Sequence, residues 1–423
     1  MESSKYRWVV TFLAFFGLII NILDRSALSY AIKPMEAEFH LNNTHFGILS
    51  SAFSVGYLIM VFFGGIIVDK VGARSVWTLT AVIWSIATLL LGFCSGFIML
   101  FALRLVTGAA EGPTGPSLMK AVTNYLPLKE RGLAFAIIIA ASPLSSVIGA
   151  PLCSFLITEF NWKIMFFVLG VLGVIWAIIW FIYYRDTPQQ SKYISQTELN
   201  LIRSVGNLPV GDLPVGNLPL IKQYKVSLHF ILTNRSLWLN NYAFFAYGYL
   251  LFFAISWLPG YLLQEFGLTL KQVGVILTIP WLVTTVLMLV FGYLSDKIYA
   301  KTRSIRLSRS LLIGVSLVVS ALFFIPTIKV SSLPVIIICL SFALGFGLAP
   351  SSCFYALNAD LAKDRASTSV GIMVGCLAIA GIIAPIITGW ISTLTGSFSS
   401  AMYIMLLLNI SSGILVILFQ KPD

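Results

Sequence analysis

The sequence predicts an all-α membrane protein with about twelve transmembrane helices, and three observations support this prediction. Hydrophobic residues make up 58% of the 423 positions and charged residues only 10%, a balance too apolar for soluble globular domains. The hydrophobic residues fall into runs of roughly 20, the length that crosses a bilayer as a helix. Connecting segments rich in basic residues alternate with segments that are poor in them, as expected for loops on the two sides of a membrane.

Each hydrophobic run is interpreted as one span, with ends defined to about 2–4 residues. The first run is longer than a signal-peptide core, is interrupted by Asn21, Asp24 and Arg25, and lacks a small-residue cleavage site, so it counts as a span. The predicted spans cover residues 8–30, 46–68, 76–95, 97–122, 132–157, 164–184, 237–263, 272–294, 308–327, 333–357, 368–391 and 399–420.

The net charge of +11 could indicate a nucleic-acid partner, but the distribution of the basic residues excludes it. With both termini inside the cell, 21 of the 27 lysines and arginines fall in cytoplasmic segments and four fall in outer loops. Arg25 and Arg104 lie within spans. This asymmetry is a strong positive-inside signal and supports an even number of helices.

The chain divides into two bundles joined by a linker. We expect an N-terminal six-helix bundle at 1–186, a cytoplasmic linker at 187–235 and a C-terminal six-helix bundle at 236–423. The linker contains NLPVG-DLPVG-NLPL at 207–220, and its prolines and glycines are typical of an extended, mobile tether.

The two bundles repeat one another in sequence, which predicts two parallel six-helix repeats of the same topology. The second span is followed by Gly65 to Arg74 (GIIVDKVGAR), and the eighth by GYLSDK with Asp296. The fourth span holds Gly108-Ala-Ala-Glu111-Gly-Pro, and the tenth holds Gly345-Phe-Gly-Leu348-Ala-Pro. Repeats of this kind rock against each other around a central site in secondary transporters.

The glycine- and charge-rich loop, its partner in the second half and the six-plus-six arrangement resemble the major facilitator superfamily. Asp24-Arg25, the Arg104-x6-Glu111-Gly-Pro pattern, Asn161-Trp162 and Trp257-Leu-Pro further resemble its anion:cation symporter family. That resemblance implies proton-coupled uptake of an organic anion such as a hexuronate, aldonate, aldarate or phthalate. Sugar-acid carriers of the family commonly have an asparagine where this chain has Ala378, which makes a less hydroxylated cargo plausible.

Asp24 and Glu111 are the two acids, of sixteen, that lie deep within predicted spans. Each charge in the membrane costs about 2.5–3.5 kcal/mol, so a retained one indicates a function. Arg104 and Glu111 are two turns apart and share a helix face. Both arginines fall in the outer half of a core of ~30 Å, and Glu111 lies ~10 Å deeper. Because the first and fourth spans run in opposite directions across the membrane, they can bring these four side chains to one cavity.

We therefore assign substrate binding to Arg25 and Arg104, because a guanidinium stays charged and grips a carboxylate with two hydrogen bonds. Asp24 and Glu111, which can change protonation, are the proton-coupling candidates. In this hypothesis, Asp24 and Glu111 pair with the two arginines when neither a proton nor a substrate is bound. The simpler alternative is that the two acids and the two arginines only neutralise each other's charge so that the helices can pack.

Other residues carry weaker predictions. Tyr57 matches a substrate-binding position of the family, although an aromatic residue in a span often serves packing. Asp69, Lys70, Arg74 and Asp296 are expected to latch the two halves at the cytoplasmic side as gating residues. The opposite wall of the pocket is expected to draw on some of Asn241, Tyr242, Tyr247, Ser256, Trp257, Trp281, Ser351, Tyr355 and Asn358.

Two other functions remain open: proton-coupled export of a drug or metabolite, and a transporter-like sensor that binds a ligand without moving it. An enzyme is not expected, since no nucleophile-base pair or metal cluster is evident in the sequence. We expect no cofactor beyond the proton gradient as energy source, protons and a small organic anion as partners, and a monomer in the lipid bilayer. The expected location is a bacterial cytoplasmic (inner) membrane.

Overall fold

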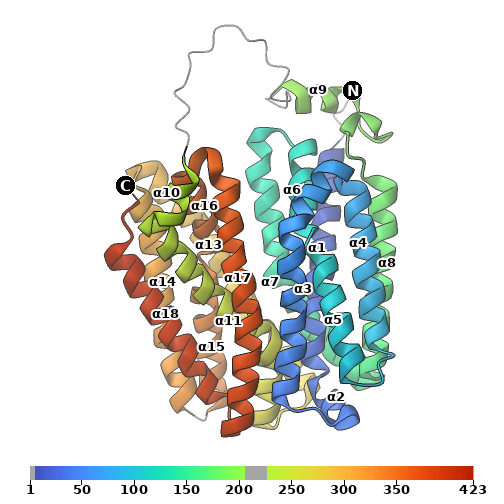
Figure 1. Cartoon of the computed structure of the whole chain (residues 1–423), viewed down its shortest axis with the longest axis vertical. Helices are drawn as coiled ribbons and strands as arrows, with labels where there is room; N and C mark the ends of the chain where they lie inside the picture. The colour runs from blue at the N-terminus through green and yellow to red at the C-terminus, as the bar shows by residue number, and fades with distance from the viewer. Residues whose placement is uncertain (1–4, 205–225, 331, 423) are drawn as a thin grey trace.

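The computed structural model describes residues 5–204, 226–330 and 332–422. The NLPVG repeats at 207–220 lie outside the described residues. Within the described part, the chain forms helices and no strands. Helix α1 begins and α18 ends at the same end of the bundle (Figure 1), which we call the terminal end; the opposite end is the far end.

Long helices form two groups that stand side by side in Figure 1, one blue to green and one yellow-green to red. We call them the N-terminal half and the C-terminal half. The first contains α1 (Tyr6–Tyr30), α3 (Asn43–Val71), α4 (Ala73–Leu91), α5 (Phe97–Glu111), α6 (Thr114–Tyr125), α7 (Leu128–Glu159) and α8 (Trp162–Tyr183). The second contains α11 (Arg235–Phe266), α12 (Leu270–Ile276), α13 (Thr278–Thr302), α14 (Leu311–Lys329), α15 (Leu333–Leu348), α16 (Ser351–Ala362), α17 (Ala366–Thr395) and α18 (Ser399–Phe419).

Among the described residues, eleven helical stretches are long and apolar enough to cross a membrane. The predicted span that is not among them is the fourth, which Gly112 and Pro113 divide into α5 and α6. Both residues keep right-handed helical backbone angles, so α6 continues directly from α5 and the pair completes the twelfth crossing. Proline lacks the N–H that an unbroken helix would use.

The same break occurs in the second half. Helix α15 ends at Leu348 and α16 begins at Ser351, with Ala349 and Pro350 between them. The paired sequence motifs therefore correspond to paired structural features, as the internal repeat predicts.

Short helices lie in the connections. These are α2 (Ile32–Phe39), α9 (Gln196–Ser204), α10 (Leu228–Thr233), and the 3₁₀ turns Pro188–Gln190 and Lys363–Arg365, while a π-helical turn at Arg306–Ser310 leads into α14. Helix α9 is held against the N-terminal half by Glu198, which is fully buried and accepts hydrogen bonds from the backbone N–H groups of Tyr6 and Arg7. Part of the predicted linker is thus folded onto the first helix.

Close packing of α3 on α5 brings together the segments that carry the site. A Cβ atom on Gly108 would stand 1.9 Å from the carbonyl oxygen of Phe53, and one on Gly56 would stand 2.1 Å from that of Leu105. Only glycine permits such an approach of two helix backbones. Phe53 and Tyr57 consequently lie directly beside the helix that bears Arg104 and Glu111.

Helices α3 and α17 join the two halves at the far end. Ser51 donates to the carbonyl of Ile382 at 2.7 Å, and the hydroxyl groups of Thr44 and Thr393 lie 2.9 Å apart. Asn43 exchanges hydrogen bonds with Gln264 of α11 at 3.2 and 3.3 Å. The halves are therefore in tight contact at the far end.

Candidate functional site

Four ionisable side chains are enclosed in the N-terminal half. Asp24 and Arg25 stand near the far end of α1, and Arg104 and Glu111 stand on α5. Asp24 is 1% exposed, Arg104 3% and Glu111 0%. The Arg25 side chain keeps 16% of its surface accessible. Charges this deep are costly and require partners inside the protein.

Arg25 and Glu111 form a direct ion pair. The Nη2 atom of Arg25 donates to Oε2 of Glu111 at 2.9 Å. The two residues come from helices that run in opposite directions, as the predicted convergence requires. One titratable acid thus neutralises one of the two candidate anion-binding arginines in this structure.

An aromatic platform supports both arginines. The guanidinium of Arg25 lies 4.6 Å from the centre of the Phe53 ring and 5.2 Å from that of Tyr57, and Arg104 lies 5.0 Å from the Phe53 centre. The rings of Phe53 and Tyr57 are nearly parallel, with centres 6.0 Å apart. A ring face attracts a cation, so Phe53 helps hold two like charges near one another.

Several buried polar atoms of this cluster have no hydrogen-bond partner among the described residues. They are both carboxylate oxygens of Asp24, Oε1 of Glu111, Nε of Arg25, and Nε and Nη1 of Arg104. Buried polar groups are nearly always paired, and exceptions need a reason. Unused donors on both arginines leave capacity for an anion, and unused acceptors on both acids leave capacity for a proton.

Sequence reasoning missed Phe53, Trp84 and Asn21. Trp84 of α4 is fully buried beside Asp24, although neither its indole N–H nor the Asp24 oxygens meet a partner at hydrogen-bonding geometry. Asn21 lies beside Glu111. A polar side chain within an apolar span was the available signal for Asn21. Phe53 and Trp84 look like ordinary packing residues in the sequence.

The proposed opposite wall contains residues with very different surroundings. Several candidates are engaged within the C-terminal half: Tyr242 with Ser411, Trp257 with the Pro385 carbonyl, and Asn358 with Met373 and Ser369. Tyr355 differs, because it remains 39% exposed. It also lies near Tyr57 of the other half.

Three of the four predicted latch residues have partners within their own halves here. Asp69 lies 3.7 Å from Lys120, and Arg74 donates to the Phe181 carbonyl at 3.0 and 2.9 Å. Asp296 pairs with Arg309 at 3.0 Å, and Lys70 is exposed. A contact between the halves through these residues stays a prediction.

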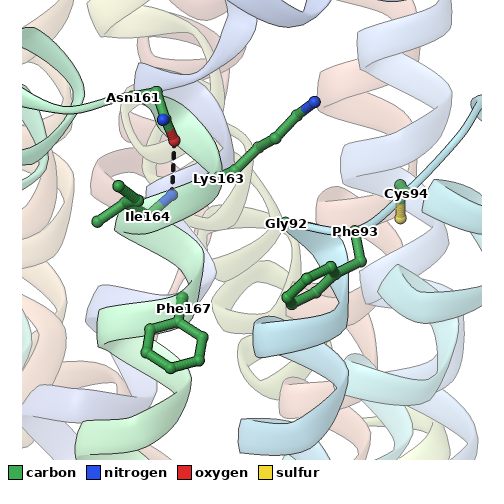
Figure 2. A pocket seen from close by; sticks show the side chains of 7 residues that line it. All are labelled: Gly92, Phe93, Cys94, Asn161, Lys163, Ile164 and Phe167. Atoms are coloured by element: carbon green, nitrogen blue, oxygen red, sulfur yellow. Dashed lines mark hydrogen bonds between the residues drawn. The ribbon is translucent and has the colours of Figure 1, made fainter.

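A separate surface cleft of about 430 Å³ lies at the far end, between the end of α4 and the start of α8 (Figure 2). In Figure 2, the side chain of Asn161 caps the helix by accepting from Ile164 N–H at 2.8 Å. The cleft is lined by Gly92, Phe93, Cys94, Asn161, Lys163, Ile164 and Phe167. None of the four charged site residues lines it, so it is distinct from the charged cluster.

The twelve crossings, the repeated halves and the enclosed charges define a polytopic transporter fold. The model of the Major Facilitator Superfamily matches residues 14–349, and the chain belongs to that superfamily, whose members are transporters and not enzymes. The fold agrees with a solved structure of a bacterial homologue of the human lysosomal transporter Spinster in an inward-facing, occupied conformation. Its TM-score is 0.77 at 16% identity, covering 99% of this chain and 97% of that one.

Curated relatives cover almost the whole chain. The hexuronate transporter of Bacillus subtilis is 30% identical over 99% of this chain and 96% of its own length. The D-galactonate transporter of Escherichia coli is 30% identical over 95% of this chain and 93% of its own. A probable sulfoacetate transporter of Cupriavidus necator is 29% identical over 95% and 91%. These relatives confirm the resemblance to organic-anion carriers of the superfamily.

Proposed function

We propose that this protein imports a small organic anion together with protons by alternating access. The observation that carries the proposal is the buried Arg25–Glu111 pair, set beside Arg104 with two unpartnered donor nitrogens. Relatives named for hexuronate, galactonate and sulfoacetate all handle carboxylate or sulfonate anions, which supports an anionic substrate.

The ion pair offers a direct way to couple the two ligands. A proton on Glu111 removes its negative charge and releases Arg25, and the freed guanidinium can then grip the carboxylate of the substrate. Arg104, close to the same ring of Phe53, is the second binding cation. Asp24 is the second proton-coupling group, since its oxygens are unpartnered and it lies within electrostatic reach of Arg104 and Glu111.

The distribution of charge supports one membrane orientation. In this proposal the terminal end, which carries the lysine- and arginine-rich segments, faces the cytoplasm of a bacterial cell, with both termini inside. The far end, where α3 meets α17, is then the outer gate, and it is closed in this structure. Asp69, Lys70, Arg74 and Asp296 would latch the cytoplasmic end when the outer gate opens. The monomer is the proposed working unit, with the proton gradient as its energy source.

Uptake by proteoliposomes tests the coupling. We expect the wild-type protein to accumulate D-glucuronate when the interior is made alkaline. Glu111→Gln and Asp24→Asn should lose accumulation but keep exchange of labelled for unlabelled anion, because an amide binds no proton in this pH range. Arg25→Ala should lose both activities. Full accumulation by both amide variants would refute the coupling roles, and binding without flux would favour a sensor.

A further inference from the structure

Tyr355 is an accessible aromatic residue of the C-terminal half that lies near Tyr57, one of the residues beside Arg25. It lies on α16, the helix that begins immediately after the break at Ala349 and Pro350. Its side chain is 39% exposed and lies near Tyr57 of the N-terminal half. Tyr57 in turn lies 5.2 Å beneath the guanidinium of Arg25. Tyr57 thus links Arg25, the proposed anion-binding arginine, to Tyr355 of the opposite half.

Buried aromatic rings hold Tyr355 in place. Phe244 of α11 packs against it edge-on, with centres 5.6 Å apart and planes at 79°. Phe244 also stacks on Tyr247 at 5.1 Å and packs against Phe354 at 5.1 Å. Phe244 and Phe354 are 1% and 0% exposed, so the accessible aromatic surface of this cluster belongs mainly to Tyr355. A fixed ring with accessible surface can stack on a ligand without a large loss of side-chain entropy.

The amide groups of Asn240 and Asn358 are engaged in hydrogen bonds within the C-terminal half. Asn240 donates to the Phe354 carbonyl at 3.1 Å, and Asn358 donates to the same carbonyl at 3.4 Å and accepts from Ser369. Position 378 is a buried alanine. Asn241 keeps an unpartnered Oδ1. Several hydroxyl groups of a sugar acid would each need a partner, and an unpartnered buried hydroxyl group costs about 1–3 kcal/mol.

We propose that Tyr355 is a specificity-determining residue that stacks on the body of the bound anion, so that the site prefers aromatic carboxylates to polyhydroxylated sugar acids. The carboxylate pairs with Arg25, and the flat body lies between Tyr57 and Tyr355. Either tyrosine hydroxyl can donate to one polar substituent. This inference rests on the proposed anion-binding role of Arg25.

Binding of two probes to purified protein tests the proposal: benzoate, which is aromatic, and D-gluconate, which is hydroxylated. We expect wild type to bind benzoate more tightly. Tyr355→Leu, which keeps bulk without a ring, should weaken benzoate about three- to tenfold, the range of a lost aromatic contact. Tyr355→Phe should retain benzoate affinity. D-Gluconate affinity should not change in either variant. Tyr403→Ala, at an exposed tyrosine of α18, is the matched control and should change neither.

Three results would decide against parts of this scheme. Tighter wild-type binding of D-gluconate would overturn the aromatic preference while leaving anion transport intact. Equal weakening of both probes in Tyr355→Leu would assign Tyr355 a structural role and also overturn it. Undiminished binding of both probes to Arg25→Ala would instead refute the proposed function, whatever Tyr355 does.

Discussion

Replacing Glu111 by leucine leaves the buried cation of Arg25 without its carboxylate. The Glu111 side chain is fully buried and Arg25 is 16% exposed, with 2.9 Å between the paired atoms. Removing one member of such a buried pair costs about 3–5 kcal/mol, because the remaining charge is uncompensated. Removing both charges, in Arg25→Met/Glu111→Leu, should restore most of that stability, since well-packed apolar groups often replace a buried pair without loss.

Thermal unfolding in detergent at one fixed scan rate measures this effect, since unfolding of a membrane protein is commonly irreversible. For a chain of this length, each kcal/mol shifts Tm by about 1–2 °C. Each single variant should therefore lower Tm by ~3–10 °C, and the double variant should lose much less than their sum. Glu36→Gln, which breaks the exposed Lys33–Glu36 pair, is the control and should have no measurable effect.

Additive losses in the double variant would refute the reasoning, because they would mean that the two side chains do not stabilise each other. The same outcome would weaken the coupling mechanism, which requires Glu111 to hold Arg25 when no substrate is bound. A double variant that is stable but inactive is the expected result.

Three further predictions follow from the geometry. Glu198→Ala removes the acceptor for the N–H groups of Tyr6 and Arg7 and the 2.9 Å ion pair with Arg7, so it should cost about 2–4 kcal/mol by thermal unfolding, whereas the exposed Glu159→Ala should not. A Thr44→Cys/Thr393→Cys pair, in a background without the native cysteines, should form a disulfide that stops uptake until it is reduced; failure to cross-link would contradict closure at the far end. Burial raises the pKa of the Cys94 thiol to about 11, so its maleimide labelling rate, followed by mass spectrometry, should rise about tenfold per pH unit from pH 7 to 10; a plateau near pH 9 would contradict the burial.

Hydropathy predicted the spans well because each helix must bury its backbone polar groups inside one apolar run. The first prediction, 8–30, lies within α1, and the last, 399–420, matches α18 to one residue at its end. Helix ends that leave the apolar region were not predictable in this way. Helix α13 continues to Thr302, beyond the predicted end at residue 294, because polar residues can extend a helix into water.

The four site charges were predictable because intramembrane charge is rare and costly. Which arginine pairs with Glu111 was not, since depth along a helix axis does not determine the rotation of its side chains around that axis. The position of Phe53 beside the two arginines could not be predicted from the sequence either. It depends on the contact of Gly108 with the Phe53 backbone, which joins residues that are far apart in the sequence.

A comparison of the two repeats distinguishes what packing requires at the position of Glu111 from what function requires there. Both halves break the same helix at a proline, after Glu111 in one half and after Leu348 in the other. Leu348 is 2% exposed, so the second half packs this position well with an apolar side chain. A carboxylate is therefore not needed to build the break. Its presence in the first half alone, paired with an arginine, supports the proposed role of Glu111 in anion binding and proton coupling.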